Sequence, residues 1–289
     1  MQINDEKYRK DADIHLEDYM GITEMGKVFD AMIRVWQKDE NRRQVINYIE
    51  KHKDELDKVN ISLEQAKQIA YDFYRNIGLE SEYKKVVEGY YNVEVNIGTM
   101  KDGKKIYISG MQEEDGEYLL NVTDHNSIET VFIIVHEFMH AMTMYDDFSE
   151  TKYLLREVCP YVIELILYEY IIENREKYGL EEEIIQDLNI IKFMRFLNYF
   201  DKPNRCLRTD YIIALIITTQ LENKTVIEKK EVLLTILELL ETNDVVQVLE
   251  SLGLRLNRKQ PNDRKKYIED IFNAFVQQFS LLISKQRKK

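Results

Sequence analysis

Apolar residues recur at helical spacing along most of this chain. Residues 25–52 and 63–76 both show this pattern, and Ser62 stands where the N-cap of the second helix is expected. The pattern returns from residue 128 onward. Because only 3 Pro and 10 Gly interrupt 289 residues, the sequence predicts a mainly α fold with long helices.

One region shows the alternation that is typical of strands. Apolar and polar residues alternate in VEVNI (93–97), before the turn-forming sequence KDGK, and again in IYI (106–108) after it. This arrangement predicts a β-hairpin over residues 93–108. A third short strand is predicted in GEYLLNV (116–122), which follows a second Asp-Gly turn.

The length and composition predict one large domain or two tightly joined halves. With 44% hydrophobic residues, the chain is long enough to bury a sizeable core, and it contains no internal repeat or low-complexity linker. We therefore expect one domain over residues 1–289. It has helices in 1–90, the hairpin and strand in 91–123, and further helices in 124–289.

Charge and cysteine content argue against several classes of protein. A formal net charge of -12 disfavours nucleic acids and anionic membranes as partners, since their phosphates repel such a surface. Two cysteines are too few for a disulfide framework. The sequence shows no apolar targeting segment and no run of about 18 apolar residues, so we expect a cytoplasmic protein without membrane spans.

The segment VFIIVHEFMHAMTMY (131–145) contains an H-E-x-x-H motif at His136, Glu137 and His140. At this chain's residue frequencies, chance would produce the motif only about 0.01 times. If residues 130–142 form a helix, the two histidines lie one turn apart on one face, where both imidazoles can bind one zinc ion. Glu137 lies about 100° around the helix, beside the metal, where its carboxylate can take a proton from water.

The helix that carries this motif is apolar on nearly all sides, which predicts that it is buried. Burying two imidazoles and a carboxylate without partners is costly, and a metal ion would be a suitable partner. The alternative is that the histidines are core residues whose nitrogens are satisfied by backbone groups or water.

A hydrolytic zinc site needs a third protein ligand and an open position for water. Glu157 and Glu164 lie seven residues apart in a second apolar segment, so they share one helix face and both are candidates. Pro160 cannot donate the helical hydrogen bond back to Arg156, so this helix must begin or kink beside Glu157. Such a break can direct the Glu157 carboxylate at the metal, which favours Glu157. The later glutamates of this segment are expected to be solvated: Glu169, Glu173 and Glu176.

These segments resemble the thimet oligopeptidase and oligoendopeptidase F family of zinc metallopeptidases. YLLNVTDHNSIETVFIIVHEFMHAM is similar to the family's strand that ends in Leu-Asn and leads into the zinc-binding helix. REVCPYVIE is similar to its third-ligand helix, and Glu157, Pro160 and Glu164 fall on matching positions. The predicted hairpin matches the family's Lys-Gly-containing hairpin at the cleft edge. With the later segments DYIIALIITTQLEN and LGL, the resemblance covers residues 62–259.

The resemblance implies a gluzincin-like helical zinc-peptidase domain that hydrolyses peptide bonds in oligopeptides. It implies zinc ligation by His136, His140 and Glu157, with Glu137 as the general base. It further implies that Tyr211 faces the zinc across the cleft and donates a hydrogen bond to the oxyanion of the transition state.

The chain departs from the family in its length and at several positions. It is considerably shorter, with little room for the family's first helical lobe. Met139 stands where the family usually has Gly before the second His. No histidine follows His140, and Tyr199 and Arg208 lie near the positions at which the family places substrate-binding His and Tyr residues.

We therefore expect a zinc metallopeptidase that acts on peptide substrates. Either Glu164 or Asp146 can hydrogen-bond the far nitrogen of a ligand histidine, and the sequence does not choose between them. Two other functions are open. The chain could be a regulatory metallopeptidase that cuts one specific protein partner, or a helical interaction protein whose site is catalytically inactive.

Overall fold

The computed structural model describes residues 43, 47, 60–91, 93–114, 117–144, 155–181, 214, 217, 218, 221 and 224–240. The helices in these ranges are α4 (Leu63–Asn76), α5 (Glu80–Val87), α6 (Ile128–Met144), α8 (Val158–Tyr178) and α11 (Val226–Leu239). The strands are β1 (Val93–Ile97), β2 (Gly110–Glu114) and β3 (Glu117–Val122). The predicted mainly α fold is confirmed for this part of the chain. Most of the helix predicted at 25–52 lies outside the described residues.

Helix α4 begins where the sequence predicted. The Ser62 hydroxyl accepts a hydrogen bond from the Gln65 N–H at 3.2 Å, which satisfies one of the N–H groups that the first helical turn leaves without a partner. After α4 the chain turns at Gly78, whose φ of 82° lies in the left-handed region that glycine enters at no steric cost. This turn lets α5 follow at once and pack beside α4.

The sheet differs from the predicted hairpin. Its strand order is β1-β3-β2, with β1 parallel to β3 and β2 antiparallel to β3. Residues 106–108 form no strand, and in this loop a single isolated bridge joins Thr99 to Lys105. The hairpin of the described sheet is therefore β2–β3, while the predicted third strand is confirmed as β3.

Burial explains why β1 pairs with β3. Ile106 is buried, but Tyr107 and Ile108 are 82% and 79% exposed, so the IYI segment adds little to the core. Strand β3 supplies the fully buried Leu120 and Val122, which make it the better partner for β1. The parallel pairing requires a crossover, and the loop 98–109 together with β2 provides it.

Helix α6 carries the H-E-x-x-H motif, as predicted, and α8 begins directly after Glu157. Pro160 lies in the first turn of α8, where its missing N–H breaks no helical hydrogen bond. The break predicted beside Glu157 is thus a helix start. Helix α8 ends at Gly179, whose φ of 67° forms a left-handed C-cap.

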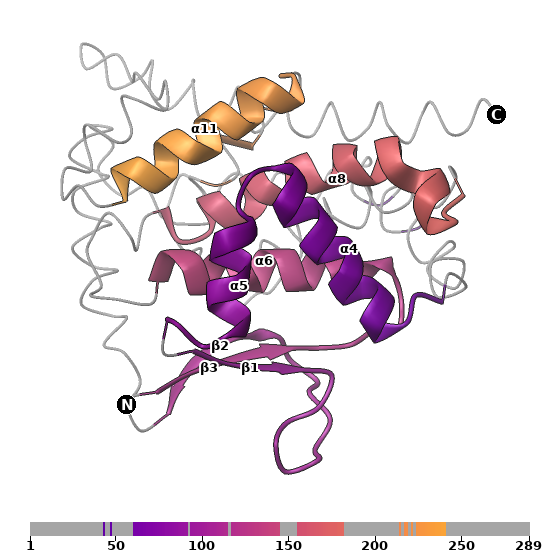
Figure 1. Ribbon diagram of the computed structural model, residues 1–289, viewed down its shortest axis with the longest axis vertical. Helices are drawn as coiled ribbons and strands as arrows, with labels where there is room; N and C mark the ends of the chain where they lie inside the picture. The colour runs from indigo at the N-terminus through magenta and orange to yellow at the C-terminus, as the bar shows by residue number, and fades with distance from the viewer. Residues whose placement is uncertain are drawn as a thin grey trace.

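Helix α6 lies at the centre of the described fold (Figure 1). It packs against β3 and β2 on one side and against α8 on the other, and α11 covers α8. Helices α4 and α5 also pack against α6. This position accounts for the apolar character of α6 on nearly all sides.

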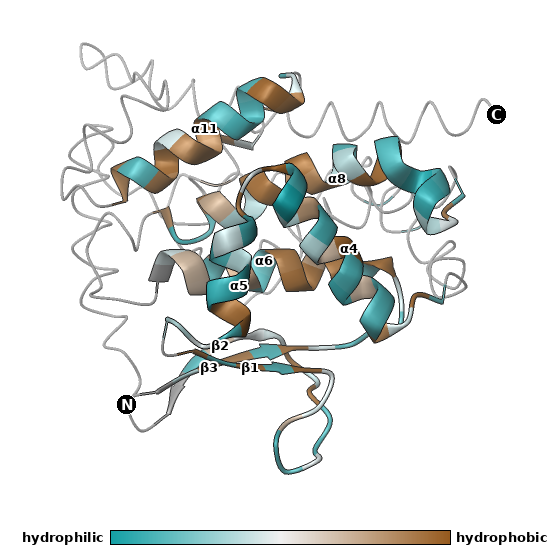
Figure 2. Cartoon of the chain, viewed as in Figure 1, coloured by the Kyte–Doolittle hydropathy of each residue, from teal (hydrophilic) through white to brown (hydrophobic). Residues whose placement is uncertain are grey.

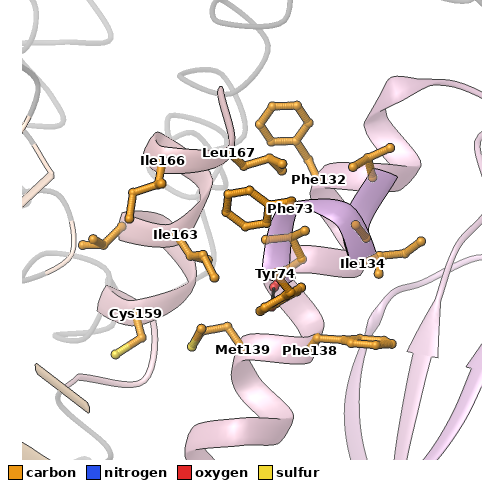
Figure 3. Packing of buried hydrophobic residues seen from close by; sticks show 14 of the residues in the cluster. Phe73, Tyr74, Phe132, Ile134, Phe138, Met139, Cys159, Ile163, Ile166 and Leu167 are labelled. Atoms are coloured by element: carbon orange, nitrogen blue, oxygen red, sulfur yellow. Dashed lines mark hydrogen bonds between the residues drawn. The ribbon is translucent and has the colours of Figure 1, made fainter. Parts of the chain in front are cut away.

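The core fills the space between α4, α6 and α8 (Figure 3). Phe73 of α4 and Phe138 of α6 are fully buried there. So is Met139, at the position where the resembled family has Gly. The Tyr74 hydroxyl donates a buried hydrogen bond to the Val135 carbonyl at 2.9 Å, which ties α4 to the residue before His136. The motif helix is therefore held by packing and by a side-chain hydrogen bond.

Helix α8 changes character along its length, from mostly hydrophobic residues in its first half to hydrophilic ones at its end (Figure 2). Buried apolar residues line the first half, while the last turns carry the exposed Glu173 and Glu176, as predicted. In the described part of the chain, no helix combines the length and the hydrophobicity needed to cross a membrane.

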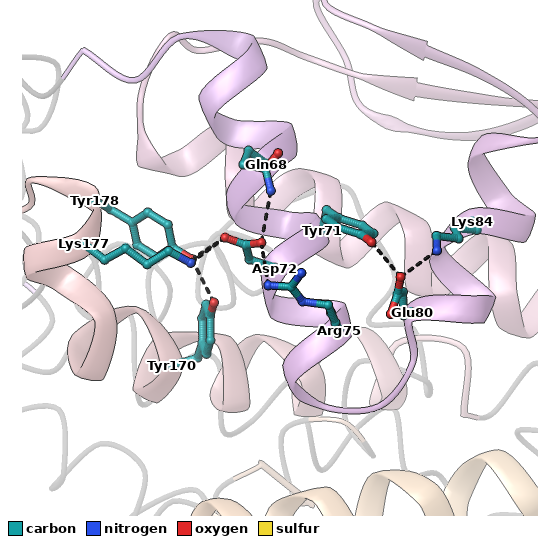
Figure 4. Close-up of polar contacts among 9 residues, drawn as sticks. All are labelled: Gln68, Tyr71, Asp72, Arg75, Glu80, Lys84, Tyr170, Lys177 and Tyr178. Carbon is teal, nitrogen blue, oxygen red and sulfur yellow. Dashed lines mark hydrogen bonds and ion pairs between the residues drawn. The ribbon is translucent and has the colours of Figure 1, made fainter.

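A polar network joins the end of α8 to α4 (Figure 4). Asp72 is buried, and it accepts hydrogen bonds from Lys177 at 2.6 Å and from Gln68 at 3.0 Å. Burial raises the pKa of Asp72, but these hydrogen bonds outweigh burial and hold the pKa below its usual value. The network thus keeps a buried carboxylate ionised and fixes α8 against α4.

Helix α11 is attached to α8 by a second ion pair. Lys229 is buried and its ammonium group contacts the Glu169 carboxylate. Glu169 was expected to be solvated; its side chain is 29% exposed, and its carboxylate also pairs with Lys229. The Glu169 carboxylate balances the buried positive charge of Lys229, which lies 60 residues later in the chain. No local sequence pattern indicates this pairing.

Candidate metal centre

Three potential metal ligands converge where α6 meets the start of α8. The Nε2 atoms of His136 and His140 are 3.1 Å apart. Glu157 Oε2 lies 3.6 Å from the first nitrogen and 3.7 Å from the second. The i, i+4 spacing in α6 brings the imidazoles together. Glu157 is the N-cap residue of α8, but its carboxylate does not cap that helix and is directed at the histidines instead.

The spacing of these three atoms fits a metal ion, and only the 3.1 Å between the two nitrogens is also a hydrogen-bond distance. Separations of 3.6 and 3.7 Å are too long for hydrogen bonds to Glu157. The circle through the three atoms has a radius of about 2.0 Å, close to the zinc–ligand distances of about 2.0–2.2 Å that are usual for imidazole and carboxylate. Among the described residues, His136, His140 and Glu157 form the group that can hold a metal ion.

The charges of the three side chains also suit a cation. Burial raises the pKa of Glu157, but the adjacent imidazoles and Arg156 outweigh burial and leave this pKa well below its usual value, so the carboxylate is ionised. Burial lowers the pKa of His140 to about 3, so this imidazole is neutral at pH 7. Burial acts in the same direction on His136, but Glu157 and Glu164 raise its pKa above the usual value. The raised pKa makes protons compete with a metal ion for the His136 imidazole, so the metal affinity should fall as the pH falls.

Glu164 hydrogen-bonds one of the two histidines. Its Oε1 lies 2.7 Å from His136 Nδ1. In this arrangement His136 donates from Nδ1 to the Glu164 oxygen, and a neutral His136 then carries its lone pair on Nε2, on the side of the other donor atoms. Of the two candidates for this role, Glu164 occupies it, while Asp146 lies outside the described residues. Tyr199, Arg208 and Tyr211 lie outside them as well.

Replacing Glu164 by Ala should lower the metal affinity about 10- to 100-fold, because His136 loses the partner that fixes its orientation and tautomer. Competition with a chromophoric chelator measures this affinity. Glu173→Ala removes an exposed glutamate from the same helix and should leave the affinity unchanged. Equal affinities in Glu164→Ala and the parent would show that this hydrogen bond does not support the centre.

Glu137 lies beside the donor group without belonging to it. The side chain is buried, and its charge is close enough to His136 to raise the pKa of that imidazole. The histidines are 16% and 11% exposed, so the centre is shielded but not sealed from solvent. A carboxylate in this position is suited to accept a proton from a molecule that reaches the histidines.

Two further residues contact the centre, and neither was predicted from the sequence. The Tyr161 ring packs edge-on against the His136 imidazole, with 5.4 Å between ring centres. Its spacing was a usable signal, because Tyr161 lies between Glu157 and Glu164 on the same helical face. Arg156 Nε lies 4.0 Å from Glu157 Oε1. This residue precedes α8, so helical periodicity could not identify it.

Comparisons with protein-family models, with curated proteins and with solved structures found no match for this chain.

Proposed function

We propose that this protein is a zinc-dependent hydrolase that cleaves peptide bonds in oligopeptides. The observation that carries the proposal is the convergence of His136 Nε2, His140 Nε2 and Glu157 Oε2 beside the Glu137 carboxylate. Two imidazoles and one carboxylate are the protein ligands of several zinc peptidases. The resemblance to the thimet oligopeptidase and oligoendopeptidase F family supports a peptide as the substrate.

His136, His140 and Glu157 would hold a zinc ion, which would supply a Lewis acid for lowering the pKa of water and polarising a carbonyl. Glu137 accepts a proton from the attacking water and returns it to the leaving nitrogen. Glu164 holds the proton on His136 Nδ1, so the Nε2 lone pair is available for the metal. Two neutral imidazoles carry no charge, so the Glu157 carboxylate supplies the negative charge of the three-ligand group.

Tyr211 is the proposed hydrogen-bond donor to the oxyanion, as the family resemblance implies. A preorganised donor of this kind contributes about 3 kcal/mol to the transition state. We expect Tyr211→Phe to lower kcat about 10²-fold in steady-state assays, while zinc content and thermal stability stay the same. If Tyr211→Phe retains full activity, Arg208 becomes the candidate, and Arg208→Lys tests whether its planar guanidinium is required.

The expected substrates are unstructured peptides, since a shielded centre can accept an extended chain more readily than a folded surface. Strand β2 is an outer strand of the sheet that the described residues form, and it contacts α6, so its outer edge can pair with a peptide backbone.

Mass spectrometry of a mixed peptide library, incubated beside a set of folded proteins, tests the proposed activity. We expect peptides to be cut and folded proteins to be spared, with cleavage lost after chelation and restored by zinc. Cleavage of a single protein alone would favour a regulatory metallopeptidase. Absence of any cleavage by the zinc-loaded chain would favour a catalytically inactive interaction protein.

A further inference from the structure

Arg156 lies beside Oε1 of Glu157, the carboxylate oxygen that is not the one approaching the two imidazoles. Its Nε is 4.0 Å from Glu157 Oε1, whereas Glu157 Oε2 is the oxygen that approaches both imidazoles. The Arg156 side chain is 12% exposed, close to the values for the two histidines. Its charge is therefore shielded from bulk water to a similar degree as the donor group.

The different neighbours of the two oxygens matter because a carboxylate can bind a metal through one oxygen or through both. Binding through both oxygens occupies two coordination positions. A hydrolytic zinc site with three protein ligands must keep a position for water or substrate. The way in which Glu157 binds thus decides how many positions are left.

A guanidinium beside Oε1 favours binding through Oε2 alone. Arginine stays charged at all relevant pH values, so its attraction for Oε1 is constant. If Oε1 turned toward the metal, it would move away from this cation and lose part of this attraction.

We propose that Arg156 is a positioning residue that restricts Glu157 to single-oxygen coordination and so keeps one coordination position available for substrate. The inference rests on the proposed zinc site. Arg156 is not itself a ligand of that site, and its role is to limit the number of coordination positions that Glu157 occupies.

X-ray absorption at the zinc edge, on the zinc-loaded full-length protein, measures coordination without turnover. We expect about four ligands in the parent and about five in Arg156→Gln, where Oε1 is released to the metal. Arg156→Lys keeps the positive charge and should stay near the parent value. Visible absorption of the Co²⁺-substituted proteins gives a second readout, because four-coordinate Co²⁺ absorbs more strongly than five-coordinate Co²⁺.

Arg75→Gln is the matched control, because it removes an arginine that pairs with Asp72 on α4. Its coordination number should equal that of the parent. Arg156→Met keeps the apolar stem of the side chain and carries the same expectation as Arg156→Gln, should the latter not fold.

An unchanged zinc spectrum in Arg156→Gln or Arg156→Met would overturn the assignment to Arg156. The same spectral change in Arg156→Lys or Arg75→Gln would also overturn it, because the effect would then not depend on the charge beside Glu157. A parent that binds zinc but cuts no peptide would contradict the proposed function alone. A parent that binds no metal would overturn both proposals.

Discussion

Replacing Glu137 by Gln should abolish most peptide hydrolysis while leaving the metal in place. Glu137 is buried beside His136 but does not belong to the donor group, so its substitution removes no ligand. Gln keeps the size of the side chain and cannot accept the proton. We expect kcat to fall at least about 10²-fold, measured by steady-state peptide hydrolysis with parallel metal analysis.

Glu129→Gln is the matched control for this experiment. Glu129 lies in the first turn of the same helix and interacts with the exposed His125, 3.8 Å away. Its substitution should change neither hydrolysis nor zinc content. If Glu137→Gln hydrolyses peptides at the parental rate with unchanged zinc, the proton acceptor is another group and the proposed mechanism is wrong.

Replacing either motif histidine by Ala should remove most of the bound zinc. His136→Ala and His140→Ala each delete one of three donor atoms, so the loss should exceed the effect of Glu164→Ala, which removes only a supporting hydrogen bond. Glu157→Ala should also weaken binding. The measurement is zinc affinity by chelator competition, with thermal unfolding to show that each variant is folded.

His125→Ala provides the control, since His125 is exposed and precedes α6. It should bind zinc as the parent does. Parental affinity in Glu157→Ala would mean that the third ligand is elsewhere, with Glu164 as the next candidate. Parental affinity in both histidine variants would refute the ligand assignment.

The elements that the sequence predicted correctly are those with local signals. Helix α4 has its Ser62 cap, and α6 has a nearly uninterrupted run of apolar residues. The hairpin over 93–108 could not be predicted correctly in the same way, because alternation identifies a strand but not its partner. Burial of Leu120 and Val122 decided that β1 pairs with β3, and this depends on the packed core.

The same distinction holds for the candidate metal centre. The spacing of His136 and His140 brings their nitrogens together within one helix, and Pro160 marks the helix start beside Glu157. The partner of His136 was ambiguous between Glu164 and Asp146, because it depends on how α8 packs against α6. No sequence pattern identified Arg156, because its position beside Glu157 depends on the path of the chain just before α8.

The zinc content of the purified full-length chain tests the central claim most directly. Metal is removed with a chelator, zinc is added back, and the dialysed protein is analysed by atomic emission beside the His136→Ala/His140→Ala double variant. We predict one zinc per chain in the parent and little in the double variant. No retained zinc in the parent, or equal zinc in both proteins, would contradict the proposed metal centre.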